Sequence, residues 1–176
     1  MTDGAVDTRI EEWARYFSDE CGDLEVEFFS GGRGMVVQVS GDGETIVRDY
    51  GGPLYSFGSI RNRRLEELRA WRSRDPERFA RIAAWLVEAE FPVAVKRFNL
   101  VADERPSTIR VRHSNGAQAS MMIVHRQARA VPALGELERE LSHLCYEESE
   151  KPSTETVANP ELVAWEGIDD GLPRPG

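Results

Sequence analysis

Lysine is nearly absent from this chain. Lys96 and Lys151 are the two lysines among 176 residues, and the formal net charge is −9. Affinity for the phosphates of nucleic acids comes from lysine and arginine side chains. The charge balance therefore argues against a general nucleic-acid-binding protein.

Long apolar runs and a secretion signal are missing as well. No stretch approaches the roughly 20 apolar residues that span a bilayer, and the Met-Thr-Asp-Gly start lacks the basic and then apolar order of a signal peptide. We therefore expect no membrane association. The expected location is the cytoplasm or an assembled particle, without secretion through a signal peptide.

Cysteine is scarce too. Cys21 and Cys145 are too few for a disulfide framework or a cysteine metal cluster. Both fall on the apolar stripes of expected helices, so we expect two buried thiols.

Motifs that carry catalysis are not found. The chain has no serine nucleophile elbow, no Walker sequence and no zinc-ligand spacing. Residues 31–34 (Gly-Gly-Arg-Gly) join two expected strands and do not lead into a helix, which favours a hairpin turn over a phosphate-binding loop. The sequence therefore predicts no catalytic residue, no cofactor and no enzyme activity.

The histidines do not converge on a common site. A two-residue turn at Asn115-Gly116 sets His113 opposite Gln118, about seven residues from His125, which is on the order of 20 Å along a strand. His143 is expected to face solvent, on the opposite side of its helix from the leucines. We therefore predict no metal site.

Helices and strands are clearly patterned in the first third of the chain. Residues 7–21 have the apolar spacing of an amphipathic helix, which ends at Gly22. Strands are expected at 24–28, 35–40 and 45–49, with a hairpin turn at Asp42-Gly43 that sets Val39 against Ile46.

Two helices are expected in the middle of the chain. Ser59 can cap a first helix that runs to Trp71, and Asp75-Pro76-Glu77 begins a second one. The second helix has a broad apolar stripe formed by Phe79, Ile82, Ala83, Leu86, Val87 and Ala89 or Glu90. Residues 59–82 contain eight arginines and four acidic residues, a local balance of +4 in a chain of −9.

The remainder repeats this pattern. A bent strand is expected at 93–101, and strands at 108–113 and 117–126 flank Asn115-Gly116. Pro132 begins a last helix, whose apolar stripe is Leu134, Leu137, Leu141, Leu144 and Cys145.

These elements predict an α+β fold in which antiparallel three-stranded meanders are flanked by helices. Residues 1–148 would form a single domain, and an alternative interpretation is a duplicated α-βββ-α unit with halves 7–73 and 75–148. The order of elements is broadly similar to that of secretion-chaperone-like α+β domains. This resemblance implies binding to proteins rather than catalysis.

Residues 149–176 have a different composition. They are acidic, contain several prolines and are expected to form an extended C-terminal arm. Leu162, Trp165 and Ile168 are spaced so that they could fill successive pockets. The arm could fold back on its own domain, or it could dock on a neighbouring subunit or partner.

The leading functional hypothesis is a non-enzymatic protein-interaction component. It would act in assembly, as an adaptor or as a chaperone, for example in a viral particle or a secretion system. The partner would be another protein or a second copy of the chain. The expected contact residues are Arg61, Arg64, Leu68, Trp71, Arg72, Leu162, Trp165 and Ile168. The alternative is a nucleic-acid-associated regulatory protein that uses the arginine-rich helix pair 59–82.

Overall fold

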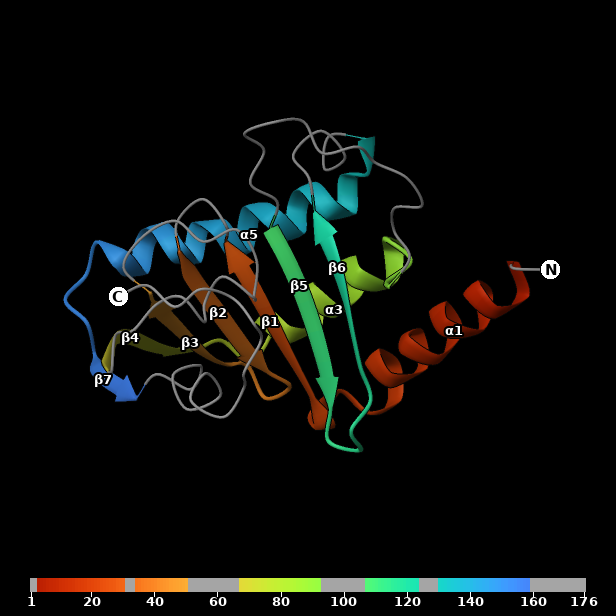
Figure 1. Cartoon of the computed structure of the whole chain (residues 1–176), viewed down its shortest axis with the longest axis horizontal. Coiled ribbons are helices and arrows are strands. Elements are labelled where there is room, and N and C mark those ends of the chain that lie inside the picture. The colour runs from red at the N-terminus through yellow and green to blue at the C-terminus, as the bar shows by residue number, and fades with distance from the viewer. Residues whose placement is uncertain (1–2, 31–33, 51–66, 93–106, 124–129, 159–176) are drawn as a thin grey trace, which may run out of the picture.

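The computed structural model describes residues 3–30, 34–50, 67–92, 107–123 and 130–158. Within these residues, α-helices pack on one face of a seven-stranded antiparallel sheet whose strand order is β6-β5-β1-β2-β3-β4-β7 (Figure 1). The helices are α1 (Asp3–Asp19), α3 (Arg78–Glu88) and α5 (Pro132–Ser149). The predicted α+β class is confirmed.

The sheet combines a meander, a hairpin and a short added strand. Strands β1 to β4 are neighbours in chain order, the hairpin β5-β6 lies beside β1, and β7 pairs with β4. The bounds are β1 (Leu24–Ser30), β2 (Met35–Ser40), β3 (Glu44–Asp49), β4 (Glu67–Arg74), β5 (Ser107–His113), β6 (Gln118–Ile123) and β7 (Glu155–Ala158), with a 3-10 turn η1 at Cys21–Asp23. The first part of the expected C-terminal arm therefore joins the sheet of its own chain.

The helix expected from Ser59 to Trp71 is wrong over its last part. Residues 59–66 lie outside the described residues, and Glu67–Arg74 form strand β4, which pairs with β3 through Val47 and Trp71. The first of the two expected halves therefore ends in a strand where the repeat unit requires a helix. Its strands share one sheet with those of the second half, since β1 pairs with β5. The expected strand 93–101 lies outside the described residues.

Both hairpins differ from the expected register by one residue. Val39 lies opposite Thr45 rather than Ile46, and Gln118 lies opposite Arg112 rather than His113. The first loop has the three residues 41–43, and in the second hairpin the amide of His113 donates to the carbonyl of Ala117 at 2.8 Å, which leaves the three residues 114–116. Each loop ends in a glycine with positive φ, +88° at Gly43 and +96° at Gly116. Three-residue loops of this kind are the usual alternative to two-residue turns.

The main core lies between the helices and the sheet. Val37 of β2, Val47 of β3 and Ile109 of β5 belong to this core, together with the buried stripes of the helices. On α1, Trp13 and Phe17 pack edge-on against Phe91, with ring centroids 5.5 and 5.9 Å away. A smaller cluster on the opposite face of the sheet contains Phe29, Val36, Tyr50 and Leu68, with Val157 packed against it.

The expected stripe of α5 is confirmed, because all five of its predicted apolar residues are buried. The stripe of α3 is confirmed except at Val87, whose side chain is 42% exposed. Cys145 is buried as expected, but Cys21 is exposed, because α1 ends at Asp19 and Cys21 begins the turn η1. None of the helices in the described part of the chain has the length and hydropathy needed to cross a bilayer.

The tip of the β2-β3 hairpin fixes the start of α3. The amide of Asp75 donates to the carbonyl of Gly43 at 3.1 Å, and a Cβ atom at Gly43 would lie only 2.1 Å from the Asp75 carbonyl oxygen. The Asp75 carboxylate accepts a hydrogen bond from the amide of Glu77 at 3.0 Å, just before the helix begins at Arg78. The start of α3 is therefore held against the β2-β3 hairpin.

Candidate functional site

Two of the predicted contact residues are enclosed by the chain itself. Leu68 and Trp71 lie on opposite faces of β4 and are each 1% exposed. Leu68 belongs to the smaller cluster, whereas Trp71 belongs to the main core and donates from Nε1 to the carbonyl of Lys151 at 2.9 Å. Neither side chain is therefore available as an exposed contact.

Arg72, the third predicted contact residue of β4, is exposed but engaged. Its guanidinium pairs with Glu44 of β3 and with Glu155 of β7, the latter at 2.7 Å. The hydrogen bond to Glu155 is the main reason that the pKa of Arg72 is raised above its ordinary value. Arg72 thus ties three strands together. The remaining predicted contact residues, Arg61, Arg64, Leu162, Trp165 and Ile168, lie outside the described residues.

Other arginines of the 67–82 region are also neutralised by nearby carboxylates. Arg69 pairs with Asp49 at 2.6 Å. Arg81 contacts Asp75 at 2.9 Å and Glu140 at 2.6 Å, and the hydrogen bond to Glu140 is the largest cause that raises the pKa of Arg81. A phosphate backbone would have to compete with these carboxylates for each guanidinium. This competition makes the free energy of nucleic-acid binding less favourable.

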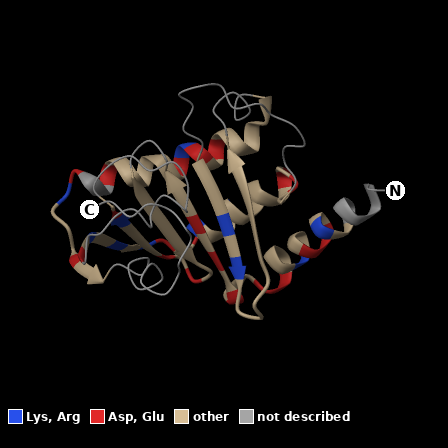
Figure 2. Cartoon of the chain, viewed as in Figure 1, with Lys and Arg blue, Asp and Glu red and all other residues tan. Residues whose placement is uncertain are grey.

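The neighbouring strands β1 and β5 carry acidic and basic residues respectively (Figure 2), which pair as a ladder of charges. Glu27 is 3% exposed and pairs with Arg110 at 2.6 Å and with Arg112. A buried carboxylate is stable only when it is paired and hydrogen-bonded. The ladder is therefore explained by pairing between neighbouring strands.

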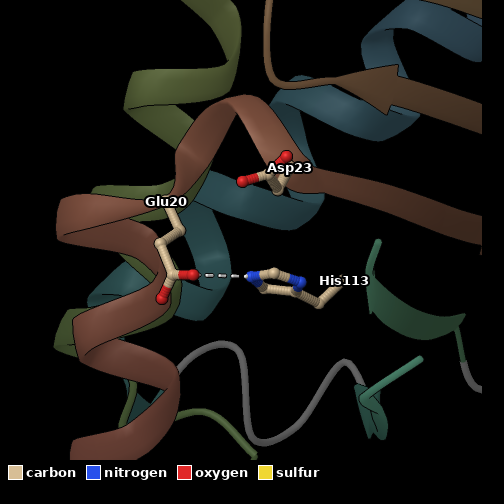
Figure 3. Close-up of side chains that lie close together, drawn as sticks. All are labelled: Glu20, Asp23 and His113. Carbon is tan, nitrogen blue, oxygen red and sulfur yellow. Dashed lines mark hydrogen bonds and ion pairs between the residues drawn. The ribbon is translucent and has the colours of Figure 1, made fainter. Parts of the chain in front are cut away.

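Glu20, Asp23 and His113 form a compact group near the end of α1 (Figure 3), with potential ligand atoms within 4.8 Å of one another. The Nδ1 atom of His113 accepts the amide of Asn115 at 3.0 Å, so in the neutral ring Nε2 carries the proton and donates to Glu20 at 3.2 Å. A metal ion on Nε2 would move that proton to Nδ1, against the Asn115 N–H. The geometry therefore favours a structural hydrogen bond over a metal site.

A hydrophobic groove of about 610 Å³ lies between α1 and α3. Its walls are Ala14, Phe17, Ser18 and Cys21 on the α1 side and Phe79, Ala80, Ala83, Ala84, Val87 and Glu88 on α3, and Gly41 and Pro76 close one end. The two helices run antiparallel, because Trp13 contacts Phe91 beyond the end of α3 whereas Cys21 lies with Pro76 at its start. We call this feature the α1–α3 groove.

Helix α3 is apolar on two adjacent sides, which explains the groove. Its inner stripe, Phe79, Ile82 and Leu86, is buried in the core. A second stripe of Ala80, Ala84 and Val87 recurs at spacings of four and three residues, and all three of these side chains are exposed. An apolar stripe that remains exposed on a helix is typical of a contact surface.

Acidic side chains border the groove. Glu88 lines it directly, and the exposed Glu11 lies three residues before Ala14 on the adjoining surface of α1. The nearby cation on α1, Arg15, lies over the ring of Tyr16 at 5.1 Å and so is directed to another side of that helix. Glu88 and Glu11, the charged residues of the described part placed at the border of the groove, are therefore both acidic.

A second groove, about 340 Å³ in volume, lies between α3 and α5, and most of its lining residues are charged or polar. It is lined by Arg78, Trp85, Glu136, Arg139, Glu140, His143, Leu144 and Glu147. The pair of Arg81 with Glu140 joins the two helices here, and Arg78 reaches past them to the hydroxyl of Thr45 at 2.7 Å. As predicted, His143 is exposed. The pair of Arg81 with Glu140 therefore links the two helices beside this groove.

Comparison of the chain with family models, with curated proteins and with solved structures returned no significant match. The surfaces described above therefore have to be judged by their own chemistry.

The α1–α3 groove was missed by the sequence analysis. The available signal was the excess of apolar residues on α3, where Ala80 and Ala84 extend the predicted stripe around the helix. Alanine is compatible with both buried and exposed helix positions, so this signal alone does not identify a surface.

Proposed function

We propose that this chain is a non-enzymatic protein-interaction component that acts in assembly, as an adaptor or as a chaperone, in the cytoplasm or in an assembled particle. The α1–α3 groove is the observation that carries the proposal. It combines a volume of about 610 Å³ with apolar walls and an exposed second stripe on α3. Exposed apolar surface of this kind costs free energy in water and is characteristic of sites that a partner covers.

The described arginines support a protein partner over a nucleic acid. Arg69, Arg72 and Arg81 are each engaged by at least one carboxylate of the same chain. The groove itself is bordered by acidic residues, which would repel phosphates. Contact with a protein through apolar groups avoids both obstacles.

The proposal is tested by placing a photo-crosslinking amino acid at Ala84 in the organism that produces the chain. The partner captured there is then purified, and its dissociation constant is measured with the full chain. Val87→Glu introduces a charge into the groove, and we expect it to weaken binding by at least about tenfold.

A matched control is available on another surface. Met122 on β6 is 39% exposed, close to the 42% of Val87, and lies outside the groove. Met122→Glu should leave the dissociation constant unchanged. The proposal is wrong if no partner can be captured at Ala84, or if the partner binds Val87→Glu as tightly as the unmodified chain.

A further inference from the structure

The geometry points to an amphipathic helix with an apolar face and basic flanks as the occupant of the α1–α3 groove. This inference rests on the proposed function and names the class of partner segment. Because the α1–α3 groove lies between two antiparallel helices, a third helix can bind along it and insert one side chain per turn.

The walls of the groove favour bulky anchors on the partner. Ala14, Ala80 and Ala84 have small side chains, so the helix backbones on both sides can be approached closely. Phe17 and Phe79 also line the groove, but they are buried and leave little surface for contact. Leucine, methionine or phenylalanine at positions i, i+3 or i+4, and i+7 of the partner would fill the space between them.

Charge selects among the possible occupants. Glu88 lines the groove, the exposed Glu11 lies on the adjoining surface of α1, and the whole chain carries −9. A partner helix with lysine or arginine beside its apolar face would be attracted to this border and steered toward it.

The same argument disfavours two occupants supplied by the chain itself. Residues 159–176 contain four acidic residues and one arginine, and a second copy would bring another charge of −9. Either would place like charges beside Glu88. Both remain outcomes that the experiments below can detect.

The inference is tested by selecting peptides of about 20 residues, long enough to form a helix on binding, from a displayed random library. The immobilised full chain is the bait, and peptides that also bind Val87→Glu are removed first. We expect the selected peptides to share apolar residues at helical spacing and a net positive charge. Binding to Val87→Glu should be at least about tenfold weaker, with no change for Met122→Glu.

Charge reversal at Glu88 tests the basic charge of the partner segment separately from its helical form. Glu88→Lys should weaken binding of the selected peptides by about threefold to fivefold at low salt. The effect should be smaller at high salt, because exposed charge pairs are screened. If the selected peptides are acidic, or are indifferent to Glu88→Lys, basic recognition is wrong while the groove still binds protein. If they lack helical spacing, or if none is selected, the helical occupant is wrong.

The competing occupants give distinct results. A second copy in the groove would appear in light scattering as a dimer that Val87→Glu dissociates. If residues 159–176 occupied the groove, they would cover Cys21. A chain that ends at Ala158 would then show faster alkylation of Cys21. Either result would overturn the inference. The crosslinking experiment at Ala84 decides the proposed function independently, since it uses the natural partner and no designed peptide.

Discussion

The two sides of α3 differ in the residues that line them and in their contacts with the rest of the chain. Toward α5, Arg81 pairs with Glu140, and most residues that line the groove on that side are charged or polar. Toward α1, Ala84 and Val87 line an apolar groove bordered by Glu88. On the α5 side Arg81 is paired within the chain, whereas the α1 side exposes apolar surface that water solvates poorly.

This difference separates stability from recognition on a single helix. Residues that hold α3 in place lie on its inner stripe and on the α5 side. We expect the exposed residues on the α1 side, Ala80, Ala84 and Val87, to contribute little to folding and to be accessible to a partner. Substitutions around α3 should therefore divide into two groups, one that changes stability and one that changes binding.

The largest contrast is expected between two consecutive residues. Leu86 is fully buried, and Leu86→Ala should lower the free energy of unfolding by about 2–5 kcal/mol, because it leaves a cavity in the core. Val87 is 42% exposed, and Val87→Ala should change it by less than about 0.5 kcal/mol. Urea denaturation of both variants measures the contrast, and equal losses would refute the division.

A smaller loss of stability is expected on the α5 side. Arg81 joins α3 to α5 and to Asp75, and Arg81→Met should cost about 1 kcal/mol or less, since the side chain is partly exposed and its ion pairs are screened. Arg139→Met is the control, because the pair of Arg139 with Glu136 lies within one helix and is more exposed. Thermal unfolding at low salt should show a lower midpoint for Arg81→Met than for Arg139→Met. Equal midpoints would mean that Arg81 does not hold the two helices together.

The weakest effect should be a dependence on pH. A hydrogen bond from Arg81 is the first cause that lowers the pKa of Asp75 from its ordinary value. A lowered carboxyl pKa stabilises the folded chain at pH values above about 4, and this contribution is lost as the pH falls further. The unfolding midpoint of Arg81→Met should therefore approach that of the unmodified chain below pH 4. A constant difference at all pH values would contradict this assignment.

The helices α3 and α5 could be predicted from sequence because their apolar spacing is regular and is supported by Asp75 and Pro132 at their starts. Strand β4 could not be predicted from the sequence in this way. Leu68 and Trp71 are three residues apart, which fits one face of a helix, yet in the structure they lie on opposite faces of a strand. Pairing with β3 decides between these possibilities, and that pairing is a tertiary contact that local sequence does not contain.

The hairpin registers show a similar limit. Asp42-Gly43 and Asn115-Gly116 correctly mark both turns, but the same residues are compatible with loops of two or three residues. The choice shifts every cross-strand pair by one position. The groove was beyond sequence analysis for a further reason. Its walls come from α1 and α3, and neither wall alone indicates a site.

The central claim is that the α1–α3 groove binds a protein segment, and Cys21 allows it to be tested directly. Its thiol is exposed at one end of the groove, whereas Cys145 is buried and should react only on unfolding. We expect a saturating concentration of a selected basic helical peptide to slow alkylation of Cys21 by at least about tenfold, and the same peptide to leave the rate unchanged in Val87→Glu. An unchanged rate in the unmodified chain, with the peptide fully bound, would place binding elsewhere and contradict the claim.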